Sequence, residues 1–596
     1  MDTVFRARWT CPGLFETPGV GQAGKRFNVQ LKLTFIITAL MCLIPLSVQA
    51  LDPAHHVTQY AHTAWRVQDG VAPVTRITQT ANGYLWFATS TGLLRFDGVK
   101  FTPYDLPPLT PLIRSYNYLL GARDGSLWIG TWDGMVRLKD GKLHWYSDPA
   151  QHSGVYAILE DPDGTIWFTR YRVPHGDGPL CRIEGRGVHC YGKADGIPVR
   201  YGLGLARDSE GNLWLGSSAL CRWRPGSGPA ATYLTNINKH PDTVEGVVDV
   251  AAGADGTIWA ATDDVEPGMG IISSAGGKWA PFAVQGFDGT KANPSWLFMD
   301  RESALWIGTG NDGTYRVHNG IAEHFGTADG LSGRYVLSIY EDREGDIWIL
   351  TDGGVDMFRN TAIVNYSQRE GLSEAGIRSA LALQDGSLWI GNANVIDIFD
   401  RDGRHSVLPA EGRFDKRVTS LFQDRKGTVW IARGTDLFAY DHGRFIPYKR
   451  PDGSGLGKRD ISAITQDAIG NIWVLTLGHL LFQIEGYSAV QVLAVSDNNR
   501  ISGSIAPDHQ GGLWISSGND GLTYYKDGTV RTVSMKIPDT SFSVSEVSVD
   551  SDDALLVATN QGLFRWDAKR WQKLDARNGL PGDVVLSVLR DNDNAV

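Results

Sequence analysis

The sequence predicts an all-β protein of tandem β-propellers, one complete seven-bladed ring followed by a second, truncated seven-bladed ring. A phrase centred on tryptophan recurs about every 42 residues, and an Asp-x-x-Gly turn precedes most copies of it. Glycine supplies 70 and tryptophan 20 of the 596 residues, a composition typical of short strands joined by tight turns. One propeller blade takes about 40–45 residues and four strands, so this period indicates stacked blades.

The tryptophan column is the strongest of these signals. Eleven of the 20 tryptophans fall at one position of the repeat, 39–47 residues apart, and Leu556 takes that position a twelfth time. A single blade buries both of its faces only by stacking against neighbours, so we expect these indoles to pack between blades. The eleven members are Trp86, Trp128, Trp167, Trp214, Trp259, Trp306, Trp348, Trp389, Trp430, Trp473 and Trp514.

Each repeat reads as four strands with a side-chain period of two. In one copy, an alternating apolar strand at 334–339 is followed by a turn at 342–345 and the tryptophan strand at 346–351. The aspartate of the turn caps backbone N–H groups, and the glycine takes a positive φ. Third and fourth strands are exemplified by 92–96 and 98–104. Helical periodicity is not convincing in any of the repeats.

The order of the strands predicts how the first ring closes. Residues 61–70 match the fourth strand of other repeats, although no first three strands precede them. We expect this strand to complete the Trp348 blade, because closure removes the free edge of a ring. The first seven-bladed propeller then spans 58–360, after a short linker at 51–57.

The second propeller is assigned to 361–596 and is expected to open with a strand at 362–366. It holds five members of the column, and a sixth unit begins at Val584. The sequence ends at Val596, where the repeat calls for the next column residue. We therefore expect a longer polypeptide, in which about 70 further residues complete the second ring.

The first 50 residues read as a leader with a signal peptide. An apolar run at 33–50 follows basic residues between positions 25 and 32 and ends in Val-Gln-Ala. Small residues at this place are typical of signal-peptidase sites, so cleavage is expected after Ala50. The alternative is an uncleaved transmembrane anchor, since the run is about 18 residues long. Both alternatives place the chain from Leu51 onward outside the cytoplasm.

The net charge limits the class of binding partner, and the cysteines allow a disulfide. A formal net charge of −10 argues against nucleic acid, which needs a clustered positive field. Cys181 and Cys190 flank a predicted hairpin turn at 184–187 and can form a disulfide if their Cβ atoms face each other. Two alternatives stay open: Cys181 can stack on Cys221, which holds the equivalent position in the next repeat, or the cysteines are buried free thiols.

Several segments resemble the two-component regulator propeller family. Residues 124–138, which read DGSLWIGTWDGMVRL, match the repeat of that family, as do 81–96 and 300–317. The opening HTAWRVQDGVAPVTRITQTANGYLWFAT resembles the start of proteobacterial sensors of this type. The resemblance covers about residues 58–596.

In that family, two seven-bladed propellers form the periplasmic sensor half of an inner-membrane receptor. An immunoglobulin-like domain, one transmembrane helix and a cytoplasmic output module follow, commonly a histidine kinase and less often a diguanylate cyclase or a DNA-binding regulator. The resemblance therefore implies a ligand-sensing region of a sensor histidine kinase, homodimeric through the full-length receptor. The kinase part does not lie within these residues.

Two alternatives come from other functional classes. One is a secreted propeller that serves as a binding scaffold. The other is a lyase, since DGTIWFT at 163–169 is also similar to streptogramin lyases, which use a His/Glu pair and a divalent metal. The chain shows no paired His-x-Glu and no nucleophile elbow, Walker loop or C-x-x-C motif. No catalytic residue, cofactor or metal ligand is predicted.

The candidate ligand-binding residues lie in loops that depart from the repeat, which are expected on one face of each propeller. Exposed aromatic, Asn and Asp side chains suit a small polar solute, a glycan or a periplasmic protein. The alternative is turn formation, because Asn and Asp before Gly favour turns. The candidates are Trp132, Asp133, Tyr171, Asn311, Asp312, Asn394, Asn519 and Asp520, with the insertions at 170–178 and 263–269.

Overall fold

The computed structural model describes residues 50–589 with internal gaps. Outside the described residues lie the predicted leader before Ala50, most of the insertion after Arg170, the insertion 263–269, the candidates Asn519 and Asp520, and 590–596. The internal gaps are 70, 90–91, 105–115, 147–153, 172–177, 235–245, 263–269, 402, 409–415, 479, 495–502, 517–520, 534, 536–542 and 551.

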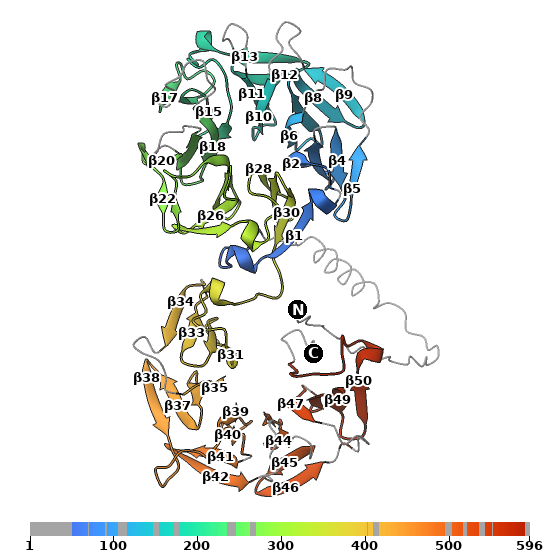
Figure 1. Ribbon diagram of the computed structural model, residues 1–596, viewed down its shortest axis with the longest axis vertical. Helices are drawn as coiled ribbons and strands as arrows, with labels where there is room; N and C mark the ends of the chain where they lie inside the picture. Colours follow the sequence, from blue (N-terminus) through green and yellow to red (C-terminus); the bar gives the residue numbers. More distant parts are fainter. Residues whose placement is uncertain are drawn as a thin grey trace, which may run out of the picture. The chain divides into compact units, whose positions relative to one another are not determined.

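The described strands form twelve four-stranded antiparallel sheets and one two-stranded sheet. Helical segments in this part of the chain are short 3₁₀ turns only. The predicted all-β class and the propeller-like succession of blades are confirmed (Figure 1). The chain divides between Asn365 and Tyr366 into two compact units, which are described separately below.

The first unit contains seven of the four-stranded sheets among its described residues. Their first strands are β2 (Val74–Gln79), β6 (Tyr116–Gly121), β10 (Gly154–Glu160), β14 (Leu205–Arg207), β18 (Val247–Ala252), β24 (Pro294–Met299) and β28 (Val336–Glu341). Their second strands are β3 (Leu85–Thr89), β7 (Leu127–Thr131), β11 (Ile166–Tyr171), β15 (Leu213–Gly216), β19 (Ile258–Thr262), β25 (Leu305–Thr309) and β29 (Ile347–Thr351).

The outer half of each sheet is formed by the third and fourth strands. The third strands are β4 (Leu93–Phe96), β8 (Gly134–Lys139), β12 (Leu180–Glu184), β16 (Leu220–Trp223), β20 (Ile271–Ala275), β26 (Thr314–His318) and β30 (Gly354–Arg359). The fourth strands are β5 (Phe101–Tyr104), β9 (Lys142–Tyr146), β13 (Gly187–Tyr191), β17 (Ala231–Tyr233), β21 (Lys278–Pro281), β27 (Ile321–Phe325) and β1 (Ala61–Arg66). A small extra sheet pairs β22 (Ala283–Val284) with β23 (Phe287–Asp288).

The first strands surround the axis of this unit. Each contacts the first strand of the next sheet, and β28 contacts both β24 and β2, so the contacts run in a closed cycle (Figure 1). The predicted pairing of the N-terminal strand is confirmed: β1 pairs antiparallel with β30, from Ala61 opposite Arg359 to Arg66 opposite Gly354. The start and end of this unit therefore meet in one sheet.

The ends of the first unit differ from the predicted linker and boundary. Leu51 and Val57, in the stretch expected as a linker, are buried and pack in a cluster with Trp306 and Phe358. Residues beyond 360 also stay with this unit, because the Gln59 side chain donates to the carbonyl of Asn365 at 3.0 Å. The strand expected at 362–366 is not formed.

Ten of the eleven column tryptophans are buried between sheets, as expected, and Trp259 is partly buried. Trp306, for example, is 0 % exposed and packs against Val336, Ile339 and Phe358 of the following sheet. Six of the indoles also donate their N–H to the turn aspartate six residues earlier, at 2.7–3.0 Å. In all of these pairs except that of Asp161, the aspartate also accepts a backbone N–H of the turn. It thus has two roles, of which the sequence analysis assigned only the turn. These pairs are Asp161–Trp167, Asp208–Trp214, Asp300–Trp306, Asp342–Trp348, Asp424–Trp430 and Asp467–Trp473.

The second unit contains five four-stranded sheets among its described residues. The first strands are β31 (Ser379–Ala382), β35 (Val418–Gln423), β39 (Ile461–Gln466), β43 (Ile505–Pro507) and β47 (Val544–Val549). The second strands are β32 (Leu388–Gly391), β36 (Val429–Arg433), β40 (Ile472–Thr476), β44 (Leu513–Ser516) and β48 (Leu555–Thr559). The third strands are β33 (Ile396–Phe399), β37 (Asp436–Asp441), β41 (Leu480–Glu485), β45 (Leu522–Lys526) and β49 (Gly562–Trp566). The fourth strands are β34 (His405–Leu408), β38 (Arg444–Tyr448), β42 (Ser488–Ala494), β46 (Thr529–Val533) and β50 (Trp571–Leu574).

The segment expected to begin a sixth unit packs on the last sheet without forming a strand. The backbone N–H of Val585 donates to Thr559 at 2.8 Å, and Val588 is buried beside Leu556. Leu586, in contrast, is 76 % exposed. A strand needs a hydrogen-bonded neighbour along its length, and none lies beside 584–589 in the described part of this unit.

Candidate ligand-binding site

Four aromatic residues gather on the first unit at the ends of neighbouring strands; we call them the aromatic cluster. Trp132 follows β7, Tyr156 lies in β10, Tyr171 ends β11 and Tyr201 precedes β14. The ring centroid of Trp132 is 6.2 Å from that of Tyr156 and 6.1 Å from that of Tyr171. Tyr171 also lies 5.1 Å from Tyr156 and 6.2 Å from Tyr201. The four rings therefore form one continuous contact network across three sheets.

Trp132 is the accessible member of the aromatic cluster. Its side chain is 39 % exposed, whereas Tyr171 is 7 % exposed. Gly154, at the start of β10, lies directly against the indole: a Cβ there would be 2.7 Å from Cε3 of Trp132. A glycine at this place lets the indole lie against the backbone. The result is a partly exposed ring on a rigid aromatic base, a surface suited to stacking on the apolar face of a polar solute.

The Asn and Asp candidates of the first unit are engaged in local turns. The backbone N–H of Asp133 donates to the Thr131 hydroxyl at 3.1 Å. Asp312 accepts from the Tyr315 hydroxyl at 2.5 Å, and burial together with this aspartate raises the pKa of Tyr315 to about 12. The loop that carries Asp312 and the exposed Asn311 joins β25 to β26, two strands of a different blade from those of the aromatic cluster. The structure thus brings together Trp132 and Tyr171, whereas Asp133, next to Trp132 in the chain, belongs to its turn and Asn311 and Asp312 lie on another blade.

Asn394, in the second unit, also belongs to a turn. Its backbone N–H donates to Asn392 Oδ1 at 3.1 Å, and its side-chain amide donates to Glu374 at 2.6 Å. The Asn392 amide in turn donates to the buried Asp397 at 2.9 Å. Both asparagines thus hydrogen-bond within their own blade, which is the turn chemistry kept as the alternative.

A second group, missed by the sequence analysis, lies inside the ring of the first unit; we call it the axial group. It consists of Arg76 on β2, Tyr118 on β6, Asp249 on β18 and Trp296 on β24. The Arg76 guanidinium lies 5.0 Å from the Trp296 ring, and Tyr118 stacks on the same ring at 6.1 Å. Strand β24 is not the neighbour of β2 or β6 in the cycle, so these contacts cross the axis.

The sequence contains a signal that points to the axial group. Each member is the third residue of its first strand, directly after an irregularity in the pairing with the second strand. A charged or large aromatic residue stands at this position in each of the four inner strands. Inspection of this column, rather than of the loops, would have found the four residues.

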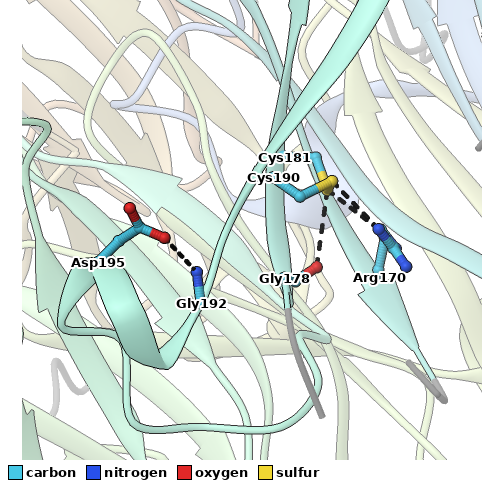
Figure 2. The surroundings of a disulfide bond; sticks show 6 residues. All are labelled: Arg170, Gly178, Cys181, Cys190, Gly192 and Asp195. Carbon is cyan, nitrogen blue, oxygen red and sulfur yellow. Dashed lines mark hydrogen bonds between the residues drawn. A yellow bond between two sulfur atoms is a disulfide. The ribbon is translucent and has the colours of Figure 1, made fainter. Parts of the chain in front are cut away.

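The structure joins Cys181 and Cys190 by a disulfide (Figure 2). The two residues are directly opposite each other in the β12–β13 hairpin, with a Cα–Cα distance of 4.0 Å. The buried Arg170 points its guanidinium at this bridge, with Nη1 at 3.1 Å from Cys190 Sγ. Cys221 is a buried free thiol, and burial raises its pKa to about 12. The bridge closes the same sheet whose strand β11 carries Tyr171.

We expect reduction of this disulfide to destabilise the first unit. Replacing both cysteines with serine, or adding dithiothreitol, should lower the free energy of unfolding by roughly 2–3 kcal/mol, the value for a loop of this length. Urea unfolding followed by circular dichroism, with and without dithiothreitol, measures this. A Cys221→Ser variant is the control and should keep its sensitivity to dithiothreitol. An unfolding midpoint that dithiothreitol leaves unchanged would contradict the prediction.

Comparison with known families supports the repeat assignment. The model of the two-component regulator propeller family matches residues 330–353 and 496–519. The predicted resemblance to this family is thereby confirmed at two repeats, one in each unit. No curated protein matches the chain.

Solved structures of propeller proteins are similar to the chain at low identity. The extracellular domain described as that of the hybrid two-component system BT3049 from B. thetaiotaomicron is 18 % identical, with a TM-score of 0.49, and 90 % of this chain and 81 % of that chain are covered. The extracellular domain described as that of the hybrid two-component system BT4673 from the same organism is 17 % identical, with a TM-score of 0.41, and 90 % of this chain and 80 % of that chain are covered. Virginiamycin B lyase from Staphylococcus aureus is 21 % identical, with a TM-score of 0.40, over 51 % of this chain and 100 % of that chain.

The described residues contain no helix of the length and apolar character that a membrane crossing requires. Within the same residues, no three His, Cys, Asp or Glu side chains come together as a metal site.

Proposed function

We propose that this chain is the extracytoplasmic ligand-sensing region of a membrane-bound signal-transduction receptor, with a two-component histidine kinase as its output. The observation that carries the proposal is the match of repeats in both units to the two-component regulator propeller family. The blades supply a rigid scaffold, and ligand binding on such scaffolds is usually carried by the loops. The apolar run at 33–50 supports export.

The disulfide supports an extracytoplasmic location. Disulfides form and persist in oxidising compartments such as the bacterial periplasm and are rare in the cytoplasm. Cys181 and Cys190 lie within hairpin register of each other, so their pairing requires no movement of the backbone. A periplasmic face of an inner-membrane receptor meets this requirement.

The aromatic cluster is the proposed ligand-binding site of the sensor. Trp132 offers a partly exposed indole held by the buried Tyr171 and by Gly154. Such a surface suits a sugar ring or another polar solute with an apolar face. A ligand shifts a receptor only through different affinities for its two states, so the loop that carries Trp132 must differ between them.

The complete gene product in isolated membranes tests this function. With radiolabelled ATP, we expect base-stable label on a histidine, and we expect Trp132→Ala and Tyr171→Ala to change the labelled fraction several-fold. Tyr487→Ala is the matched control, because Tyr487 is an aromatic residue that is 77 % exposed in the other unit. If the labelled fraction is unchanged in both variants, the proposal that the aromatic cluster binds the ligand is wrong. Formation of a cyclic dinucleotide from GTP, without label from ATP, would replace the kinase output with a diguanylate cyclase.

A further inference from the structure

The axial group places two opposite charges inside the first ring without direct contact between them. Arg76 comes from β2 and Asp249 from β18, strands that lie on different sides of the axis. Asp249 has no ion-pair partner among the described residues, although the charge of Arg76 acts on it. Each charge is therefore hydrogen-bonded by other groups, and both side chains come from the first strands, which surround the axis.

Arg76 has unused hydrogen-bonding capacity. Its Nη1 donates to the carbonyls of Thr75 at 2.6 Å and Leu337 at 3.0 Å. Its Nε is buried and makes no hydrogen bond with any described residue. A buried guanidinium donor without an acceptor is costly, and a carboxylate is the acceptor whose geometry fits its fork. This side chain therefore points to an anionic group that the protein does not itself supply.

Asp249 is the complementary half of the axial group. One carboxylate oxygen accepts the backbone N–H of Leu297 at 2.8 Å and the other that of Val250 at 2.9 Å. Burial raises the pKa of Asp249 to about 7, and the hydrogen bonds from Leu297 and Val250 together with the charge of Arg76 only partly offset this rise. A carboxylate so deeply placed gains from a cation close to it.

The surfaces between these charges are aromatic and accessible. Trp296 and Tyr118 stack across the axis, and Tyr156 of the aromatic cluster is close enough to act electrostatically on Arg76. Arg76, Tyr118, Asp249 and Trp296 are all half-buried, so part of each surface remains accessible although they lie deep within the ring. One cation, one anion and two aromatic rings thus lie around the axis of this unit.

We propose that the axial group is a binding site for a small zwitterion, an α-amino acid with an apolar side chain. The carboxylate of the ligand accepts from Arg76, its ammonium group donates to Asp249, and its side chain contacts Trp296 and Tyr118. A simple anion would leave Asp249 without a cation, and a simple cation would leave the Arg76 donors unused. This binding does not depend on which output the receptor carries.

Three related ligands separate the proposal from its alternatives. The purified chain is first screened by thermal shift with each of the twenty standard amino acids at about 10 mM, a concentration that saturates a site with a millimolar Kd. Titration calorimetry then compares L-phenylalanine with phenethylamine, which lacks the carboxylate, and 3-phenylpropanoate, which lacks the ammonium group. We expect each truncated ligand to bind about ten- to hundredfold more weakly, because each leaves one buried charge without its partner.

Conservative variants assign the two ends of the ligand. Asp249→Asn keeps an acceptor for Leu297 and should weaken L-phenylalanine but not 3-phenylpropanoate. Arg76→Lys keeps the charge, loses the planar fork and should weaken both ligands. Arg123→Lys is the matched control, since Arg123 is 62 % exposed on the surface. Circular dichroism and the melting temperature verify folding of each variant.

Two results would overturn the zwitterion site. One is the absence of any thermal shift or heat of binding with all twenty amino acids in the folded wild-type chain. The other is amino-acid binding that Asp249→Asn and Arg76→Lys leave unchanged. Neither result affects the receptor assignment, which is tested through phosphorylation and the aromatic cluster.

Discussion

Deletion of residues 51–66 is expected to open the first ring and abolish its cooperative unfolding transition. Strand β1 is the fourth strand of its sheet, and Trp65 stacks on Trp348 with ring centroids 5.6 Å apart. His62 hydrogen-bonds at 2.8 Å to Asp356, a side chain that is 0 % exposed. The deletion exposes the Trp348 face, removes a partner of a buried carboxylate and leaves an unpaired edge.

The size of this effect is large on the scale of domain stability. Loss of the partly buried Trp65 side chain alone should cost about 2–4 kcal/mol, against a total of about 5–15 kcal/mol for a typical folded domain. A Trp65→Ala variant therefore gives a graded form of the same test. Differential scanning calorimetry and near-ultraviolet circular dichroism of the whole chain measure both changes.

Two internal controls accompany the deletion. The transition of the second unit should keep its midpoint, because none of its described residues contacts β1 in the hydrogen-bonded sheets. Trp132→Ala removes a tryptophan that is 39 % exposed and should cost much less than Trp65→Ala. A first unit that unfolds at its original temperature without β1 would show that the N-terminal strand does not stabilise the ring.

Asp300→Ala is expected to destabilise the first unit by roughly 2–6 kcal/mol, since two buried N–H groups lose their acceptor. One carboxylate oxygen of Asp300 accepts the Ala304 backbone N–H at 2.7 Å, and the other accepts the Trp306 indole N–H at 2.8 Å. Trp306 is 0 % exposed, so water cannot replace the lost acceptor without a change in packing. Urea unfolding monitored by tryptophan fluorescence gives the free energy.

Two substitutions calibrate this result. Asp300→Asn keeps one acceptor oxygen and should show an intermediate loss. Asp163→Ala removes an exposed turn aspartate whose carboxylate accepts the Thr165 N–H at 2.9 Å, and should cost at most about 1 kcal/mol. Equal losses for Asp300→Ala and Asp163→Ala would mean that the indole hydrogen bond does not stabilise the blade.

The strands and turns of this protein follow from short-range patterns. Alternation of apolar residues, the Asp-x-x-Gly turn and the tryptophan column act over a few residues to one repeat, so a single sequence suffices to predict blades. The pairing of 61–66 was predictable for the same reason, because that segment copies a fourth strand. Trp132 and Tyr171 could be named as candidates because they depart from the repeat.

Side-chain contacts that depend on strand register or on packing were harder to predict from the sequence. From the sequence, Cys181 could pair with Cys190 across the hairpin turn, or stack on Cys221, which holds the equivalent position in the next repeat. The register of the hairpin places Cys181 opposite Cys190 and so decides for the disulfide. The segment after Val584 has the pattern of a strand but forms none, because a strand is completed by a neighbour and not by its own residues.

The sequence by itself therefore determined the all-β class, the repeating blade and the closure of the first ring by its N-terminal strand. Only the tertiary structure decided that Asp300 binds the indole of Trp306 and that Arg76, Tyr118 and Trp296 meet across the axis. Arg76 and Trp296 stand far apart in the sequence, on strands that are not paired with each other. The curvature of the whole ring brings them together, and short-range patterns in the sequence do not predict which strands face each other across it.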